Sequence, residues 1–310
     1  MNPQISFLLN RSLESLRNSN LDSAELYLKQ ALKLQSTNPH VLRLLGVVFA
    51  QRMRYAEALD CLNNSLKYLP KNSLTLSNLG NVFLELKQYD SALDAYDKSL
   101  KIDSKYHEAW SNKGNALHEL KRFDEAITHH EKALSLKPDY AEGWSNKANA
   151  LNSLKRHSES AKCYQKALAY SMRDSYLLGQ AHHQMMLGCD WTNYESYTNE
   201  IFYLVNEGRK GHEPFGFQGI SISEELSKKC AEIYSSNKFP ALDDLSKFSQ
   251  YKHHKIRIGY LCGEFRDHAT SILMTHVWEL HNKAKFEIFA FDNGWDDGSD
   301  YRQRIVGAFD

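Results

Sequence analysis

The sequence predicts a mainly α-helical protein in which a superhelix of paired-helix repeats is followed by an incomplete α/β lobe. Two observations lead to this fold class. Small and bulky residues recur every 34 positions through roughly the first 170 residues, which indicates a helical repeat array. After residue 252 the pattern changes to alternating strands and helices, which favours a parallel sheet.

Composition limits the class of protein before any motif is considered. The 310 residues carry 38 Lys plus Arg and 38 Asp plus Glu, so no excess charge attracts a polyanion, and nucleic acid is not expected as a partner. The apolar run Ile5–Leu9 is too short for a signal peptide or a membrane span. Five scattered cysteines without a C-x-x-C pair fit reduced thiols. We therefore expect a soluble, cytoplasmic protein without a membrane partner.

Five repeat units are visible when the first half of the chain is written in rows of 34. Two columns hold small residues: Gly46, Gly80, Gly114 and Ala148, and Ala24, Ala58, Ala92, Ala126 and Ser160. A third column is bulky: Leu28, Leu62, Tyr96, His130 and Tyr164. This pattern resembles the tetratricopeptide repeat, in which small residues let paired helices cross closely and bulky ones fill the gaps. We expect a tetratricopeptide-repeat superhelix of five repeats over residues 1–172.

Asparagines recur in the first helix of three successive repeats, in the segments SNLGNVF, SNKGNAL and SNKANAL. We define two asparagine rows: the first is Asn78, Asn112 and Asn146, and the second is Asn81, Asn115 and Asn149. Residues three apart share a helix face, and the first helix of each such repeat lines a concave surface. Because asparagine is a poor helix former, its recurrence indicates a role beyond helix formation.

The asparagine rows predict a groove that binds polypeptide substrates or partner proteins. A side-chain amide offers both a donor and an acceptor, which suits the backbone of an extended polypeptide. The alternative is that these amides bond only to neighbouring helices. Related repeat domains that clamp a C-terminal carboxylate carry lysine three residues before the glycine column, where this chain has Ser77, Ser111 and Ser145. A carboxylate clamp is therefore not expected.

A bridge of helices and loops is expected over residues 173–252. Amphipathic patterns predict helices at 176–188, 194–208 and 224–236, with a loop-rich stretch at 208–223. His182, His183 and Cys189 lie close in sequence, but no further ligands stand at the spacing of a known zinc motif. We expect no metal site there.

The pattern over residues 253–310 predicts a strand at 255–261, a helix at 268–281, a strand at 285–291 and a helix at 299–309. This order is the beginning of a Rossmann-like lobe. Two apolar parallel strands with their own crossover helices cannot bury both faces of a sheet, so the lobe is expected to be incomplete. Gly259 and Gly263 do not form the G-x-G-x-x-G phosphate loop.

The ordered series after the array carries a more specific resemblance. The array leads through GCDWTNY and PFGFQGIS into KIRIGYLCGEFRDHATSILM and KFEIFAFDNGWDDGSDYRQRI. This series resembles the bacterial branch of the protein O-linked N-acetylglucosamine transferase family, the SPINDLY-like proteins. The resemblance implies an inverting GT-B transferase whose two Rossmann-like lobes hold a nucleotide-sugar donor, UDP-GlcNAc, and which glycosylates Ser or Thr hydroxyls.

The same resemblance implies that the donor is held mainly by the second lobe, whose residues are not among these 310. We therefore expect this chain alone to bind no cofactor or donor and to be inactive, as the N-terminal part of a truncated catalytic protein. The stretch FRDHA differs from the Asn-His-Pro-Thr-Ser form of animal members, which leaves the donor sugar open. The alternative function is a non-enzymatic scaffold whose array binds other proteins.

His268 is the candidate catalytic residue. It follows the first strand and begins a helix, where the helix dipole favours a neutral imidazole, and ligands of open α/β sheets gather at the carboxyl ends of strands. The resemblance places the matching histidine in the active-site cleft, where a neutral ring is able to orient or accept the proton of an acceptor hydroxyl. The alternative is that His268 and Asp267 only cap the helix.

Overall fold

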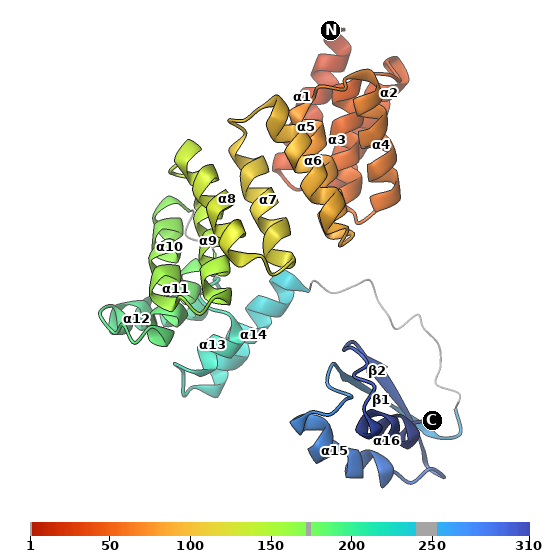
Figure 1. Cartoon of the computed structure of the whole chain (residues 1–310), viewed down its shortest axis with the longest axis vertical. Coiled ribbons are helices and arrows are strands. Elements are labelled where there is room, and N and C mark those ends of the chain that lie inside the picture. The colour runs from red at the N-terminus through yellow and green to blue at the C-terminus, as the bar shows by residue number, and fades with distance from the viewer. Residues whose placement is uncertain (1, 172–174, 240–252) are drawn as a thin grey trace. The chain divides into compact units, whose positions relative to one another are not determined.

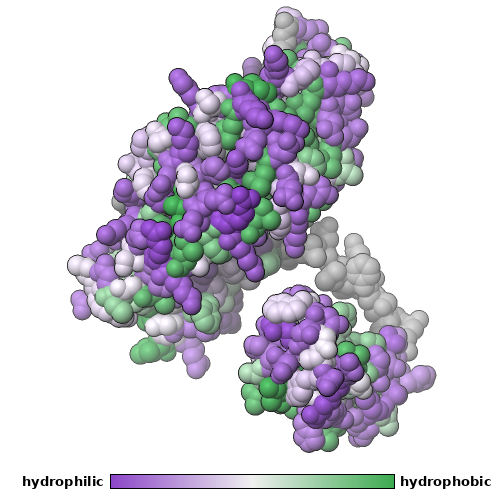
Figure 2. Space-filling view, in the orientation of Figure 1, coloured by the Kyte–Doolittle hydropathy of each residue, from purple (hydrophilic) through white to green (hydrophobic). Residues whose placement is uncertain are grey.

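The structure is a computed structural model that describes residues 2–171, 175–239 and 253–310 (Figure 1). Contacts divide the chain into two compact units, residues 1–240 and residues 241–310. The first is built of helices and the second has a small parallel sheet. Hydrophilic residues predominate on the surface of both units in the view of Figure 2. The predicted fold class, a repeat superhelix followed by an α/β lobe, is confirmed.

Ten helices form the five predicted repeats, and the two helices of each repeat pack against each other. The pairs are α1 (Pro3–Arg17) with α2 (Leu21–Leu34), α3 (Pro39–Gln51) with α4 (Tyr55–Tyr68), α5 (Ser73–Glu85) with α6 (Tyr89–Ile102), α7 (His107–Glu119) with α8 (Phe123–Leu136), and α9 (Ala141–Ser153) with α10 (His157–Tyr170).

The two helices of a repeat cross so closely that the column of Gly46, Gly80 and Gly114 has no room for a larger side chain. A Cβ atom added to Gly80 would lie 2.5 Å from Cε1 of Tyr96, and one added to Gly114 would lie 2.6 Å from Cε1 of His130. The side chain from the bulky column therefore fills the space that the glycine leaves, as Leu62 also does beside Gly46. The predicted partnership between the small and bulky columns is confirmed.

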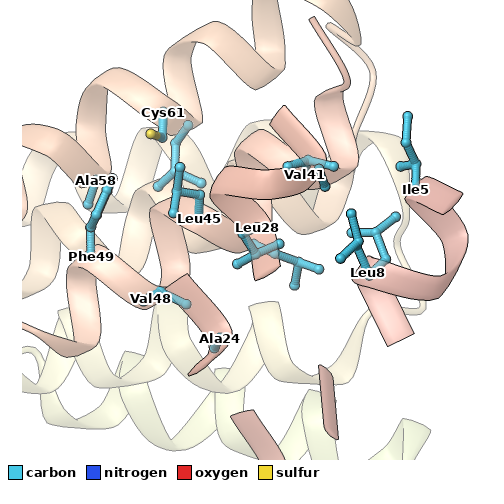
Figure 3. Packing of buried hydrophobic residues seen from close by; sticks show 14 of the residues in the cluster. Ile5, Leu8, Ala24, Leu28, Val41, Leu45, Val48, Phe49, Ala58 and Cys61 are labelled. Atoms are coloured by element: carbon cyan, nitrogen blue, oxygen red, sulfur yellow. The ribbon is translucent and has the colours of Figure 1, made fainter. Parts of the chain in front are cut away.

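The hydrophobic core of the first repeats is continuous from one helix pair to the next. Side chains from α1 to α4 interlock in it, as Figure 3 shows: Ile5, Leu8, Ala24, Leu28, Val41, Leu45, Val48, Phe49, Ala58 and Cys61. Each of these side chains is less than a tenth exposed. Because each repeat buries its apolar face only against its neighbours, the array gains stability from stacking.

A left-handed residue separates the two helices of every repeat. These residues share a φ between 54° and 61° and stand 34 apart: Ser19, Met53, Lys87, Lys121, Lys155 and Cys189. At Lys121 the backbone N–H donates to His118 O at 2.8 Å, and the next N–H, of Arg122, donates to Leu117 O at 2.9 Å. This is the Schellman end of a helix, adopted without glycine.

The recurrence of that turn at Cys189 means that the repeat geometry continues into the bridge. Helices α11 (Leu177–Leu187) and α12 (Tyr194–Asn206) flank it, and α11 packs on α10. The predicted division at residues 172/173 and 252/253 stays a prediction, since residues 172–174 and 240–252 lie outside the described residues.

Two further helices complete the first unit. Helix α14 (Glu224–Lys238) agrees with the predicted helix, whereas the short helix α13 (Pro214–Gln218) lies inside the stretch predicted as loop. That expectation was wrong for these five residues. Pro214 occupies the first turn, where a missing N–H costs nothing, and Phe217 is fully buried, so tertiary packing holds a helix too short to show a period.

Over its described residues, 253–310, the second unit is a two-stranded parallel sheet with two helices. Strands β1 (Ile256–Cys262) and β2 (Phe286–Asp292) pair in register, from Ile256 with Phe286 to Cys262 with Asp292. Helices α15 (Ala269–Glu279) and α16 (Asp300–Ala308) pack with the sheet in one core that includes Trp278, Ile288 and Ile305. All four predicted elements are present.

One face of this sheet lacks a covering layer among the residues that the structure describes. Ile258 and Ile288, paired across the strands, face the core, whereas the paired Leu261 and Phe291 are 76% and 59% exposed. This agrees with the expectation that two strands and their helices do not bury both faces of a parallel sheet.

Candidate functional site

The asparagine rows lie on the first helices of the third, fourth and fifth repeats. These helices, α5, α7 and α9, contact one another in succession, so their shared face forms a continuous surface. Most of the asparagines are half-buried, and Asn149 is exposed. The structure therefore places the predicted residues on one surface of three neighbouring helices, which we call the groove.

Hydrogen bonds connect the two rows across repeats. The amide nitrogen of Asn112 donates to Oδ1 of Asn81 at 2.9 Å, and the hydroxyl of Tyr96 donates to the same oxygen at 2.7 Å. One row thus orients the other, and the bulky column reaches the groove through Tyr96. Two repeats later the contact recurs, since the hydroxyl of Tyr164 donates to Oδ1 of Asn149.

The first row is also held from behind by buried serine and histidine. The amide of Asn146 donates to Ser111 Oγ at 3.3 Å, and Ser111 Oγ lies 3.3 Å from Nδ1 of the buried His130. Ser77 and Ser111, the positions without a clamp lysine, are both buried. Polar contacts between helices therefore do involve the asparagines, as the alternative interpretation expects.

These bonds do not use the whole capacity of the amides. Each asparagine side chain offers two N–H donors and a carbonyl oxygen with two lone pairs. Asn112 uses one of its donors in the bond to Asn81. Among the described residues, the side chains of Asn78 and Asn115 have no hydrogen-bond partner. The groove therefore combines amides fixed in orientation with amides that remain able to bond a ligand.

Three cavities of about 350 to 360 Å³ follow the groove. The first is lined by Asn78 and Asn81, the second by Asn115, Asn146 and Asn149, and the third again by Asn149. The lining changes along the array: the first cavity is largely aliphatic, with Val47 and Leu62, whereas the second is lined only by polar side chains.

In the second unit, His268 lies beyond the carboxyl end of β1 as the N-cap residue of α15. Its backbone is extended, and its Nδ1 accepts a hydrogen bond from the backbone N–H of Thr270 at 3.3 Å. The imidazole that accepts at Nδ1 carries its proton on Nε2, and the side chain is 42% exposed. The structure therefore shows the predicted cap, while a role in chemistry stays a prediction.

The loops that follow the two strands hold each other in place beside His268. A Cβ atom on Gly294 would lie 2.1 Å from the carbonyl oxygen of Gly263, so no other residue fits there. Arg302 of α16 donates to Phe265 O at 2.6 Å and to Asp292 at 2.7 Å. The backbone N–H of Asp267 donates to Asp297 at 2.9 Å.

Sequence reasoning missed this role of Arg302 and Asp297. No role is predicted from the sequence for the Asp-rich segment GWDDGSD (294–300), which follows the predicted strand at 285–291, although Asp is common where side chains bond nearby backbone N–H groups. That composition was the available signal. The contact partner of Arg302 is 37 residues away in sequence and carries no local signal.

Histidines near the bridge are neutral by burial. Burial lowers the pKa of His182 and of His183, and lowers that of His212 to about 4. His182 lies 3.1 Å from Thr198 Oγ1 and stacks on Tyr194. Across the described part of the chain, no three metal-ligating side chains cluster. Nor does any described helix combine the length and apolar character that crossing a membrane requires.

The fold and the two sites define a class: a tetratricopeptide-repeat superhelix carried in one chain with a parallel α/β unit. Comparison with protein families agrees. Residues 9–67, 80–121, 107–140 and 141–171 match tetratricopeptide-repeat models, and residues 217–310 match the model of glycosyl transferase family 41.

Curated relatives are peptide N-acetylglucosaminyltransferases. The Caenorhabditis elegans UDP-N-acetylglucosamine–peptide N-acetylglucosaminyltransferase is 23% identical over 134 residues, 38% of this chain and 12% of that protein. A probable Arabidopsis thaliana enzyme of the same description, SEC, is 28% identical over 89 residues, 28% of this chain and 9% of that protein. The matches span a small part of the length of either relative. The resemblance to the O-linked N-acetylglucosamine transferase family is confirmed.

Solved structures support the repeat fold. The chain is similar to Pseudomonas aeruginosa PilF, with a TM-score of 0.57 and 20% identity over 70% of this chain and 96% of that one. It is also similar to a tetratricopeptide-repeat protein of Thermus thermophilus, with a TM-score of 0.54 and 19% identity over 60% of this chain and 99% of that one. At these identities the similarity concerns the fold alone.

Proposed function

We propose that the protein carrying this sequence is a protein O-glycosyltransferase. In this proposal the repeat groove binds polypeptide substrates, and the α/β unit contributes to a catalytic domain that transfers N-acetylglucosamine from UDP-GlcNAc to Ser or Thr. The observation that carries it is the presence, in one chain, of the two asparagine rows and of a segment at 217–310 that matches glycosyl transferase family 41.

His268 is the proposed catalytic residue. The bond from Thr270 N–H to Nδ1 holds the ring at the end of β1, and Nε2–H is left to donate a hydrogen bond to an acceptor hydroxyl or to the sugar. The neighbouring loops are braced through Arg302 and Gly294, so the ring stands on a fixed backbone. A ring that is fixed before the reaction loses less freedom when it meets the substrate.

Transfer by the protein that carries this sequence tests the proposal. It is incubated with UDP-GlcNAc and an unstructured Ser/Thr peptide, and mass spectrometry follows the addition of one N-acetylhexosamine. Two variants separate chemistry from capping: His268→Asn keeps a good N-cap residue, whereas His268→Ala loses both the cap and the imidazole. We expect both variants to lose at least ~10-fold in rate, because each lacks the ring.

The outcomes are distinct. If His268→Asn transfers at the parent rate while His268→Ala is destabilised, then His268 only caps α15. If the parent protein transfers no sugar to any peptide, yet the groove still binds polypeptide, the alternative of a non-enzymatic scaffold is favoured. That alternative rests on the same repeat fold, which generally mediates protein–protein interaction.

A further inference from the structure

The third cavity along the groove has a negatively charged lining. It measures about 360 Å³ and lies among α9, α10, α11 and the segment 212–216. Glu213 is its one formally charged lining residue within the described chain, and neither lysine nor arginine lines it. The lining histidines are neutral at pH 7, because burial lowers the pKa of His183 and lowers that of His212 to about 4.

Two hydrogen-bond acceptors of the segment 212–216 are incompletely paired among the described residues, the ring of His212 and the carboxylate of Glu213. His212 is 4% exposed, and its Nδ1 lies 2.9 Å from the carbonyl oxygen of Glu213, which requires the ring to donate there. Nε2 of the neutral ring is then an acceptor, and it is buried with no partner among the described residues. The carboxylate of Glu213 accepts only one side-chain bond, from Gln180 at 3.2 Å.

An unpaired buried acceptor normally costs stability, whereas the half-buried carboxylate of Glu213 still has lone pairs to offer a donor. The backbone around His212 is specialised for this ring. A Cβ atom on Gly216 would lie 2.1 Å from Cε1 of His212, and one on Gly179 would lie 2.7 Å from its Cγ. The ring is thus held between two glycines rather than packed loosely.

The rim adds an aromatic surface. Phe215 lines the cavity and is 86% exposed, although a phenylalanine side chain is otherwise favoured inside the protein. An aromatic face beside a carboxylate attracts a cation, and a planar guanidinium both stacks on the ring and donates several hydrogen bonds. The cavity also shares Asn149 with the asparagine rows, so it is continuous with the groove.

We propose that this cavity is a subsite for an arginine side chain of the polypeptide that lies along the asparagine rows, with Glu213 as its counter-ion and Phe215 as its stacking surface. The inference rests on the proposed function, since it requires polypeptide in the groove. The contacts from the asparagine amides do not distinguish one substrate sequence from another. The subsite would add such a preference, because polypeptides with a positive charge at the position that meets Glu213 would bind more tightly than neutral ones.

Two fluorescent peptides test this subsite. Both are unstructured Ala/Ser/Thr/Gly peptides that differ at one central residue, arginine in one and citrulline in the other, so that shape is retained and only the charge is lost. Binding to the protein is measured by fluorescence anisotropy at low ionic strength. We expect the arginine peptide to bind ~10-fold more tightly, as charge-assisted hydrogen bonds allow.

The variant Glu213→Gln keeps the shape of the side chain and removes its charge. It is expected to reduce the arginine-to-citrulline ratio to about 1 while leaving citrulline binding unchanged, and Phe215→Leu is expected to reduce the ratio in part. The matched control is Glu200→Gln on α12, the same chemical change at an exposed position that does not line the cavity. This control is expected to keep the full ratio.

Each result decides between the two proposals. A ratio near 1 in the parent protein, or a ratio that Glu213→Gln leaves intact, overturns the arginine subsite while groove binding stands. Failure of both peptides to bind the parent protein overturns groove binding and the subsite together. Circular dichroism of Glu213→Gln establishes whether the variant is folded, and a helical spectrum matching the parent is expected.

Discussion

A single side chain, that of His130, couples the packing of the array to pH. It occupies the bulky column against Gly114, where Tyr96 and Tyr164 serve other repeats, and it is fully buried. Burial is the main cause that lowers its pKa to about 3, assisted by the nearby His118, His129 and Lys147. The folded protein thus holds the ring neutral, whereas the unfolded chain takes up a proton below about pH 6.5.

The sign of the effect follows from that difference. Because the unfolded state binds more protons between about pH 6.5 and 3, the stability from His130 is complete above that range and is lost as pH falls through it. Between pH 7 and pH 5, the free energy of unfolding of the parent protein is expected to fall by ~2 kcal/mol more than that of the variant His130→Tyr. Urea denaturation followed by circular dichroism measures this, and equal pH dependence in the two proteins would contradict it.

At the scale of elements, the helices α5, α7 and α9 present the asparagine rows as one surface. The spacing of the asparagines in the sequence predicted that they share a groove, because residues three apart lie on one helix face and the repeat recurs every 34 residues. It did not predict that Asn112 bonds Asn81 or that Tyr96 reaches the same oxygen. Those contacts depend on how neighbouring repeats are stacked, for which a single sequence has no local pattern.

The same contrast holds for the other elements. The strands of the second unit were predicted to within a residue or two, since apolar strand patterns are local. Helix α13 was missed because five residues are too few to show a helical period, and its stability comes from burying Phe217. The bracing of the loop beside His268 by Arg302 likewise joins residues far apart in sequence.

Replacement of the first row tests the groove at this scale. The triple variant Asn78→Ala, Asn112→Ala and Asn146→Ala is expected to weaken binding of unstructured polypeptide, because each lost bond contributes only ~1 kcal/mol and the losses add. Helical content and thermal midpoint are expected to change little, since the higher helix propensity of alanine offsets the loss of the hydrogen bonds from Asn112 and Asn146. Titration calorimetry with an unstructured polypeptide measures the binding, and unchanged affinity would remove the row from recognition.

At the scale of the whole molecule, the two units differ in how completely their elements are covered. Repeats in the first unit stack on neighbours, and their core side chains are almost fully buried. In the second unit the described helices cover one face of the sheet, and Leu261 and Phe291 remain exposed on the other. An apolar face without a partner gives little stability, so local opening requires less free energy there.

Amide hydrogen exchange is expected to reveal this difference. In the 310-residue chain, the N–H groups between Lys255 and Asp310 are expected to exchange faster than those of α3 and α5, which lie in the interior of the array. Mass spectrometry of peptic fragments measures both regions in one sample, with α9 as a control of equal helical character. Protection in β1 and β2 equal to that in α5 would show that the uncovered sheet face does not weaken the unit.

The direct contact between α5 and α7 and between α7 and α9 also sets a length scale for whatever lies in the groove. Packed helix axes stand about 8–10 Å apart, while an extended chain advances about 3.3 Å per residue. A bound strand therefore advances by about three residues from one repeat to the next. Odd and even residues of a strand point to opposite sides, so successive repeats meet alternating sides of the strand. On the proposed function, the three asparagine-bearing repeats would contact about seven residues of an extended polypeptide, which sets the shortest unfolded segment that reaches all three repeats.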